Sequence, residues 1–248
     1  AAPGIAYDLP DILGQQREHY AGRHTLLIGA GYSAATSALA LADLVRQVPQ
    51  TRVTWVTRRA GSADQHGPLP SIPNDRLAER DRITRQANAL ANSRREDFRH
   101  IAGMTVEAVE ALDGDAGFNV RLVGDGPAES LHADRIIANV GYRSDTRLFA
   151  ELQVHLCYAT DGPMKLAAAL SGNSADCLDQ VGGGPESLLT SEPNFYVLGS
   201  KSYGRNSKFL ISIGLQQIRD LFTIIGDRED LDLYRGEQNL TPGGEALI

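Results

Sequence analysis

The feature that most constrains the fold is TLLIGAGYSAAT, residues 25–36, where a short apolar run ends in closely spaced glycines and small residues. The run at 25–29 predicts a buried strand bounded by glycine. Strong helix formers fill residues 33–48, and Pro49 ends them. The β-branched run at 51–57 predicts a second strand. Together these segments predict a βαβ unit with parallel strands and a right-handed crossover.

The turn between the first strand and the helix follows the pattern G-x-G-x-x-A at Gly29, Gly31 and Ala34. Gly29 permits a tight turn, Gly31 lets the backbone approach a pyrophosphate, and Ala34 lets helix and strand pack closely. Amides and the dipole at the helix start then attract the anion. A glycine that merely ends a strand is the structural alternative. The predicted phosphate site consists of Gly29, Ala30, Gly31, Tyr32, Ser33 and Ala34.

The end of the second strand indicates which dinucleotide would bind. An NAD site usually has Asp or Glu there, which holds the ribose 2′-hydroxyl. Here the sequence is WVTRR, with Thr57, Arg58 and Arg59 and no carboxylate. A hydroxyl and two guanidinium groups can hold a 2′-phosphate through charge-assisted hydrogen bonds, worth about 1.5–3 kcal/mol each. We therefore predict NADP(H), the alternative being a solvated basic strand end.

The rest of the chain continues the mixed α/β pattern. Charged and apolar residues alternate at helical spacing over 75–95, and a DGDAG turn separates two runs typical of antiparallel strands. The further predicted elements are strands at 135–140, ending at Gly141, and at 194–199, ending in Gly199, a helical run at 164–170 and a helix at 212–226. The predicted organisation is a linker at 1–22, a domain at 23–145 and a second at 146–248.

Composition limits the classes of partner. The net charge of −7 disfavours nucleic acid, and no apolar stretch approaches the roughly 20 residues that cross a bilayer. A cytoplasmic protein acting on small molecules is expected, and its oligomeric state, including a homodimer, is left open. The six histidines show no metal-ligand spacing, so no metal is expected. Cys157 and Cys177 are too far apart for a CxxC pair and are expected to be inert.

Three longer stretches resemble one superfamily, the two-dinucleotide-fold flavoproteins, which include flavin-containing monooxygenases and pyridine nucleotide-disulfide oxidoreductases. TLLIGAGYSAATSALAL with TRVTWVTRR resembles their NADPH-binding domain. RIIANVGYRSDTRLFAEL is similar to the A-T-G-Y-x-P-D segment that leads back to the FAD domain. PNFYVLGSKSYGRNSKFLISIGLQQIRDLFTII is similar to that domain's closing strand and helix. The resemblance therefore implies an α/β protein with a Rossmann-like NAD(P)-binding domain at 23–145 and the C-terminal part of an FAD-binding domain at 146–248.

The resemblance also implies which residues approach the flavin cofactor. The strand-end glycine approaches the flavin nucleotide, and the start of the last helix faces the flavin ring. The implied contacts are Gly141, Gly199, Ser200, Lys201, Ser202 and Tyr203.

The sequence departs from the superfamily pattern in several places. No FAD-binding glycine motif is seen near residue 1, so the chain is expected to correspond to the second and third segments of such a flavoprotein. The redox CxxC is absent, and Leu13 and Glu18 stand at the Phe and His positions of the monooxygenase motif F-x-G-x-x-x-H. Ser200 stands where an acid often follows Gly199. The missing CxxC and the residues at 13 and 18 weigh against both well-known subfamily activities, and Ser200 weighs against the usual FAD contact.

The expected function is an NADPH-dependent flavoprotein oxidoreductase, in which NADPH delivers hydride to FAD and the electrons pass to oxygen or an organic acceptor. No side chain is assigned as a catalytic acid or base. A non-catalytic NADP(H)-binding or regulatory module is the alternative from another class. A flavin-independent NADP dehydrogenase is disfavoured, because no Tyr/Lys or His/Asp catalytic pair is visible.

Overall fold

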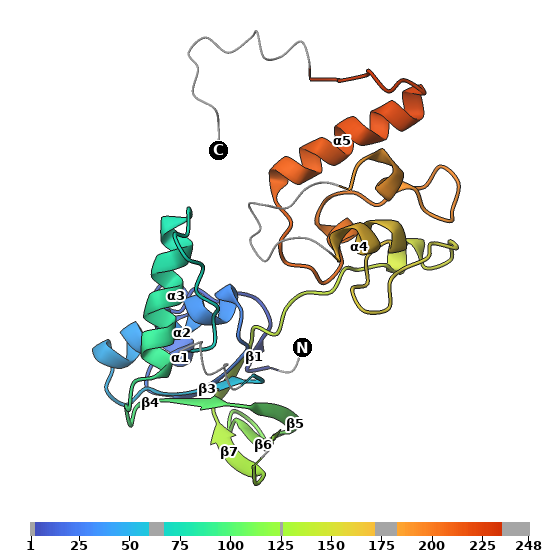
Figure 1. Cartoon of the computed structure of the whole chain (residues 1–248). Coiled ribbons are helices and arrows are strands. Elements are labelled where there is room, and N and C mark those ends of the chain that lie inside the picture. Colours follow the sequence, from blue (N-terminus) through green and yellow to red (C-terminus); the bar gives the residue numbers. More distant parts are fainter. Residues whose placement is uncertain (1–2, 60–66, 125, 172–182, 235–248) are drawn as a thin grey trace. The chain divides into compact units, whose positions relative to one another are not determined.

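The computed structural model describes residues 3–59, 67–124, 126–171 and 183–234 (Figure 1). The chain forms two compact units, Ala1–Gly141 and Tyr142–Ile248, called unit 1 and unit 2 below. The change of unit falls at Gly141–Tyr142, whereas the sequence placed it at 145–146. Each unit is described by itself.

Unit 1 is built on a five-stranded sheet in which every neighbouring pair is parallel, in the order β1-β8-β2-β3-β4. The predicted βαβ unit is present as β2, α2 and β3, and the predicted α/β fold class is confirmed. The strand order reverses between β2 and β8, which makes this point the topological switch of a doubly wound sheet. The elements are β1 (Ile5–Ala6), β2 (His24–Ile28), α2 (Tyr32–Gln47), β3 (Arg52–Thr57), β4 (Phe98–Ala102) and β8 (Arg135–Ala138).

Two layers cover the faces of this sheet (Figure 1). On one face Leu27 and Trp55 pack with apolar residues of α2 and of α3 (Ala78–Ala91). On the other face Leu26 and Val56 pack against an antiparallel sheet. Because side chains alternate between faces and both faces are buried, β2 and β3 read as continuous apolar runs. The antiparallel sheet consists of β5 (Met104–Ala111), β6 (Phe118–Gly124) and β7 (Glu129–Ala133).

The first 22 residues, expected to be a linker, contribute to unit 1. They contain β1, which pairs with β8, and the short helix α1 (Arg17–Tyr20). Ile12 and Tyr20 are each 1% exposed and belong to the core on the helix side of the sheet. The sequence analysis also missed β4 and β7, which are only five residues long and have neither a continuous apolar run nor a regular alternation of polar and apolar residues.

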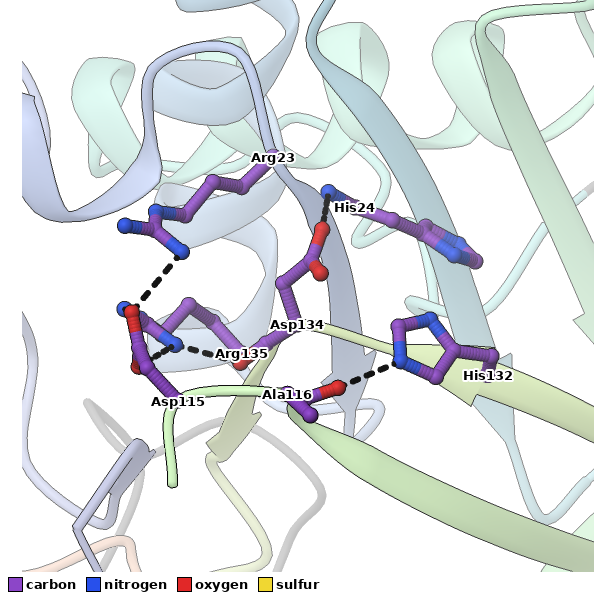
Figure 2. Close-up of polar contacts among 7 residues, drawn as sticks. All are labelled: Arg23, His24, Asp115, Ala116, His132, Asp134 and Arg135. Carbon is purple, nitrogen blue, oxygen red and sulfur yellow. Dashed lines mark hydrogen bonds and ion pairs between the residues drawn. The ribbon is translucent and has the colours of Figure 1, made fainter. Parts of the chain in front are cut away.

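Polar contacts join the antiparallel sheet to the first residues of β2 and β8 (Figure 2). The Arg135 side chain is 6% exposed, and its Nη1 lies 2.8 Å from Asp115 Oδ1 in the turn before β6. Arg23 Nη1 lies 3.2 Å from the other oxygen of the same carboxylate. Beside them, the His24 N–H donates to Asp134 Oδ2 at 2.6 Å. A single carboxylate thus pairs with two guanidinium groups, one of them buried.

Unit 2 is mostly helices and turns around a small described core of Leu166, Tyr203 and Ile213. The helices predicted at 164–170 and 212–226 are present. The strand predicted at 194–199 is wrong, because a strand needs a neighbour that accepts and donates its ladder hydrogen bonds. The described part of unit 2 offers only an isolated bridge elsewhere. Its elements are η1 (Arg147–Phe149), α4 (Met164–Leu170), η3 (Pro185–Leu188), η4 (Gly199–Tyr203) and α5 (Ile211–Gly226).

Candidate nucleotide-binding site

The first glycine of the turn is required by the fold itself. Gly29 follows β2 at the switch point and has φ +137°. A Cβ added there would lie 2.2 Å from the backbone oxygen of Asn139, too close for any side chain. The Gly29 N–H donates to the carbonyl of Val56 at 3.1 Å and so continues the link to β3. Packing alone therefore explains this glycine.

The second glycine is different. Gly31 is the N-cap of α2 with φ −96° and ψ 179°, a conformation open to any residue. A Cβ added there would meet nothing within 4 Å. No side chain caps this end of α2, and the backbone N–H groups from Ala30 to Ala34 have no acceptor among the described residues. Open space in front of unsatisfied donors is what a pyrophosphate needs.

The remaining residues of the turn are placed as follows. Ala30 and Ser33 are half-buried. The Tyr32 hydroxyl lies 3.3 Å from Thr84 Oγ1, so its side chain leans toward α3. Ala34 is fully buried, and its Cβ would lie 3.3 Å from a Cβ on Gly29. The small side chain of Ala34 thus lets the start of α2 pack against the turn.

The residues at the end of β3 divide into one buried and two exposed groups. Thr57 is 1% exposed, and its hydroxyl donates to the Arg59 carbonyl at 3.2 Å and contacts His100 Nε2 at 3.0 Å. The Thr57 hydroxyl therefore holds the turn rather than facing outward. Arg58 and Arg59 are exposed and form no ion pair within the described part of the chain. By contrast, Arg99 on neighbouring β4 pairs with Glu129 at 2.6 Å.

Asn139 is a residue of the switch point that the sequence analysis missed. It is 8% exposed, its Oδ1 accepts from Ser37 Oγ of α2 at 2.8 Å, and its Nδ2 donates to the carbonyl of Asp8 at 2.9 Å. These bonds fix the end of β8 against α2. The sequence did contain a signal for it, because Asn139 is a polar residue directly after the carboxyl end of an apolar strand.

The residues expected near flavin lie in both units. Gly141, just after β8 in unit 1, is exposed with φ +94°. In unit 2, the Gly199 N–H donates to Gln217 Oε1 at 2.8 Å. Gln217 Nε2 donates to Ser202 Oγ, which in turn donates to the Gly199 carbonyl, each at 2.8 Å. Gly199 and Ser202 are therefore occupied in a closed ring of hydrogen bonds.

The other three expected flavin contacts are also mixed. Tyr203 is 1% exposed and packs edge-on against Phe209, and burial raises the pKa of its hydroxyl. Ser200 and Lys201 are exposed, and Lys201 Nζ donates to the carbonyl of Asp145 at 3.0 Å. Among the residues described in unit 2, no second strand–glycine–helix turn is present. Among the described residues, the amides at the start of α2 in unit 1 thus leave room for a phosphate group, whereas those of unit 2 include no such turn.

Three further observations concern other features of the chain. Within the described ranges, no three or more His, Cys, Asp and Glu side chains could hold a metal ion. No helix in those ranges has both the length and the apolar character that a membrane crossing requires. Cys157 is a free thiol whose pKa is lowered by hydrogen bonds from Thr160, and Cys177 lies outside the described residues.

Several solved structures have the same fold. A bacillithiol disulfide reductase from Bacillus cereus has a TM-score of 0.61 at 19% identity, over 92% of this chain and 56% of that one. The corresponding protein from Staphylococcus aureus has a TM-score of 0.55 at 19% identity, over 87% and 53%. A thioredoxin reductase from T. acidophilum has a TM-score of 0.54 at 13% identity, over 91% and 59%.

No protein-family model and no curated protein matches the sequence. The chain spans little more than half the length of the structures described above. At these identities the likeness shows the fold alone. The fold expected from the resemblance to two-dinucleotide-fold flavoproteins is confirmed.

Proposed function

We propose that unit 1 binds NADP(H) and that the protein works as an NADPH-dependent flavoprotein oxidoreductase. One observation carries the proposal: the open space at Gly31 faces amides that have no acceptor among the described residues, and exposed Arg58 and Arg59 at the end of the adjacent strand pair with no described carboxylate. β2 and β3 are parallel neighbours, with Ile28 opposite Val56. The glycine turn and the two arginines therefore lie at the same edge of the sheet.

Each group has a defined part in binding. The amides at the start of α2 would hold the pyrophosphate, aided by the helix dipole. Arg58 and Arg59 would contact the 2′-phosphate, which guanidinium forks recognise well. A nicotinamide held in this way would supply a hydride, and FAD in the intact protein would accept it and pass the two electrons on to oxygen or an organic acceptor. The disulfide and thioredoxin reductases with this fold support an oxidoreductase.

Calorimetric titration with NADPH and NADH tests the proposal. We expect NADPH to bind at least about tenfold more tightly, because two guanidinium groups can pair with the extra phosphate. The double variant Arg58→Ala, Arg59→Ala should remove this difference. Arg52→Ala with Arg94→Ala is the matched control, since these exposed arginines give the same loss of charge away from the strand end. Equal affinities of the unaltered protein for the two nucleotides would refute NADP(H) selectivity.

The second candidate is a non-catalytic NADP(H)-binding or regulatory module. It is favoured by unit 2, whose described residues provide no second phosphate-binding glycine turn. The coding sequence upstream of residue 1 discriminates between the two candidates. A G-x-G-x-x-G between a strand and a helix there supports the flavoenzyme, and an upstream region without it supports the module.

A further inference from the structure

Three side chains on the helix-covered face of the parallel sheet connect the two ends of the proposed nucleotide site. Trp55 and Thr57 are two residues apart on β3, so they lie on the same face. His100 of β4 is directly opposite Trp55 in the parallel register, and the two rings are 5.0 Å apart. We call Trp55, Thr57 and His100 the β3 brace.

At the glycine end, the brace fixes the peptide between Gly29 and Ala30. Trp55 is fully buried, and its indole N–H donates to the Gly29 carbonyl at 2.8 Å. In a planar trans peptide the N–H points opposite to the carbonyl. The Ala30 N–H is therefore directed away from the indole, and no described group accepts its hydrogen bond. Trp55 thus orients one of the donors proposed for the pyrophosphate.

At the arginine end, the brace fixes the turn after β3. The Thr57 hydroxyl carries one proton, which it donates to the Arg59 carbonyl at 3.2 Å. His100 Nε2 lies 3.0 Å from the same Thr57 oxygen. The chain His100, Thr57, Arg59 carbonyl therefore fixes the backbone that carries both exposed arginines. A turn held in advance loses less conformational entropy on binding.

We infer that the β3 brace holds the pyrophosphate turn and the 2′-phosphate turn in place, with His100 and Thr57 as positioning residues for the choice of the phosphorylated nucleotide. The inference rests on the proposed NADP(H) site. The inference predicts different effects on nucleotide binding for the two ends of the brace. Trp55 acts on the pyrophosphate, which NADPH and NADH both contain, whereas Thr57 and His100 act on a turn that only NADPH uses.

The same strand offers a matched control on its other face. Thr54 is 6% exposed, and its hydroxyl lies 2.9 Å from His24 Nε2. Thr54 and Thr57 each make a hydrogen bond to a histidine of a neighbouring strand, but Thr54 does not contact the turn. Thr54→Val and Thr57→Val therefore each remove a buried hydroxyl, but only Thr57→Val removes one that contacts the arginine turn.

The test measures dissociation constants for NADPH, NADH and adenosine 2′,5′-bisphosphate on the full chain, together with thermal unfolding. Because one hydrogen bond contributes about 0.5–1.5 kcal/mol, Thr57→Val and His100→Leu should weaken NADPH about two- to tenfold and leave NADH within about twofold. His100→Gln keeps a side chain that can hydrogen-bond to Thr57, and Thr57→Ser keeps the hydroxyl, so both should restore binding. Trp55→Phe should weaken both dinucleotides equally.

The outcomes separate the inference from the proposed function. Loss of NADPH affinity in Thr57→Val but not in Thr54→Val supports the brace. Equal effects of the two variants, or equal losses for NADPH and NADH in Thr57→Val, would overturn it. If Arg58→Ala with Arg59→Ala leaves NADPH binding unchanged, the proposed function itself fails. Should Thr57→Val not fold, the comparison of His100→Leu with His100→Gln decides, and equal binding by these two overturns the inference.

Discussion

Gly31 in unit 1 and Gly199 in unit 2 show how the same sequence feature serves two purposes. Each follows an apolar segment, and a Cβ added to either would meet nothing within 4 Å. Gly31 has an ordinary φ of −96°, whereas Gly199 has φ +69°. The amides after Gly31 have no described acceptor, but the Gly199 amide is bonded to Gln217. A glycine after an apolar run thus indicates a ligand only where backbone donors are left over.

The two units also bury their apolar residues differently. The sheet of unit 1 is covered on both faces, by helices and by a second sheet. In unit 2, α5 buries Ile213 together with the polar Gln217, while Ile211 and Ile225 are 79% and 59% exposed. The described apolar core of unit 2 is therefore smaller than either core cluster of unit 1. This difference predicts distinct responses to substitution.

The largest expected effect is that of Gly31→Val on nucleotide binding. A valine side chain would occupy the open space proposed for the pyrophosphate, so NADPH affinity should fall by about a hundredfold or more as several hydrogen bonds are lost. Because the backbone of Gly31 is in an ordinary conformation, destabilisation should be modest. Calorimetry and circular dichroism on the same sample measure both. Retained binding by the folded variant would make the turn purely structural.

The next effect concerns flavin. The pyrophosphate of FAD needs several charge-assisted hydrogen bonds, which are worth about 1.5–3 kcal/mol each. The described donors of Gly199 and Ser202 already make hydrogen bonds within unit 2. We therefore expect the 248-residue chain to purify colourless, without FAD co-eluting on gel filtration. Absorbance near the flavin bands measures this. A yellow protein with stoichiometric FAD would show that unit 2 offers more than its described donors.

Local pattern was enough to predict the βαβ unit and its glycine turn. Runs such as 25–29 and 51–57 carry their own signals of strand and turn, because buried parallel strands are continuously apolar. Asn139 and the β3 brace could not be predicted, since they depend on which strands become neighbours. The role of His100 depends on the pairing of β3 with β4, which brings it opposite Trp55 and which the sequence alone does not show.

The strand predicted at 194–199 failed for a related reason. Its apolar residues suit a strand, but strand formation depends on a partner that no local pattern reveals. Phe195–Leu198 instead lead into the η4 turn, where Gly199 is held by Gln217 from α5. Long-range hydrogen bonds of this kind, 18 residues apart, leave no periodic trace in the sequence.

A smaller effect is expected from Gln217→Leu in unit 2. Gln217 is 4% exposed, and its loss leaves the Gly199 N–H without its partner, at a cost of about 1–3 kcal/mol. Native-state hydrogen exchange should show faster exchange in unit 2 and unchanged exchange in unit 1. Ser212→Leu is the control, because Ser212 is exposed on the same helix and its side chain makes no hydrogen bond to a described residue. Equal effects of the two variants would contradict a structural role for the hydrogen-bonded ring.

The smallest expected effect is on stability, and it concerns two carboxylates that each pair with two arginines. Asp115 of unit 1 pairs with Arg23 and with Arg135, whose side chain is 6% exposed. Asp161 of unit 2 pairs with Arg143 and Arg205, which are 71% and 45% exposed. An unpaired buried cation is costlier than an exposed one. Asp115→Asn should therefore lower the stability of its unit more than Asp161→Asn does.

The pH dependence gives this last prediction its sign. Hydrogen bonding from Arg135 lowers the pKa of Asp115 below its usual range, and Arg205 and Arg143 do the same for Asp161. A lowered pKa in the folded state means stability that is present above the unfolded pKa and is lost as the pH falls through the folded value.

Urea midpoints of the parent and Asp115→Asn should therefore differ at neutral pH and approach each other toward about pH 3. Fluorescence of Trp55, the one tryptophan, reports unit 1, and hydrogen exchange follows unit 2. Two results would contradict the buried arginine as the cause. One is a difference in urea midpoint between the parent and Asp115→Asn that stays constant with pH. The other is a loss of stability in Asp115→Asn that is smaller than the loss in Asp161→Asn.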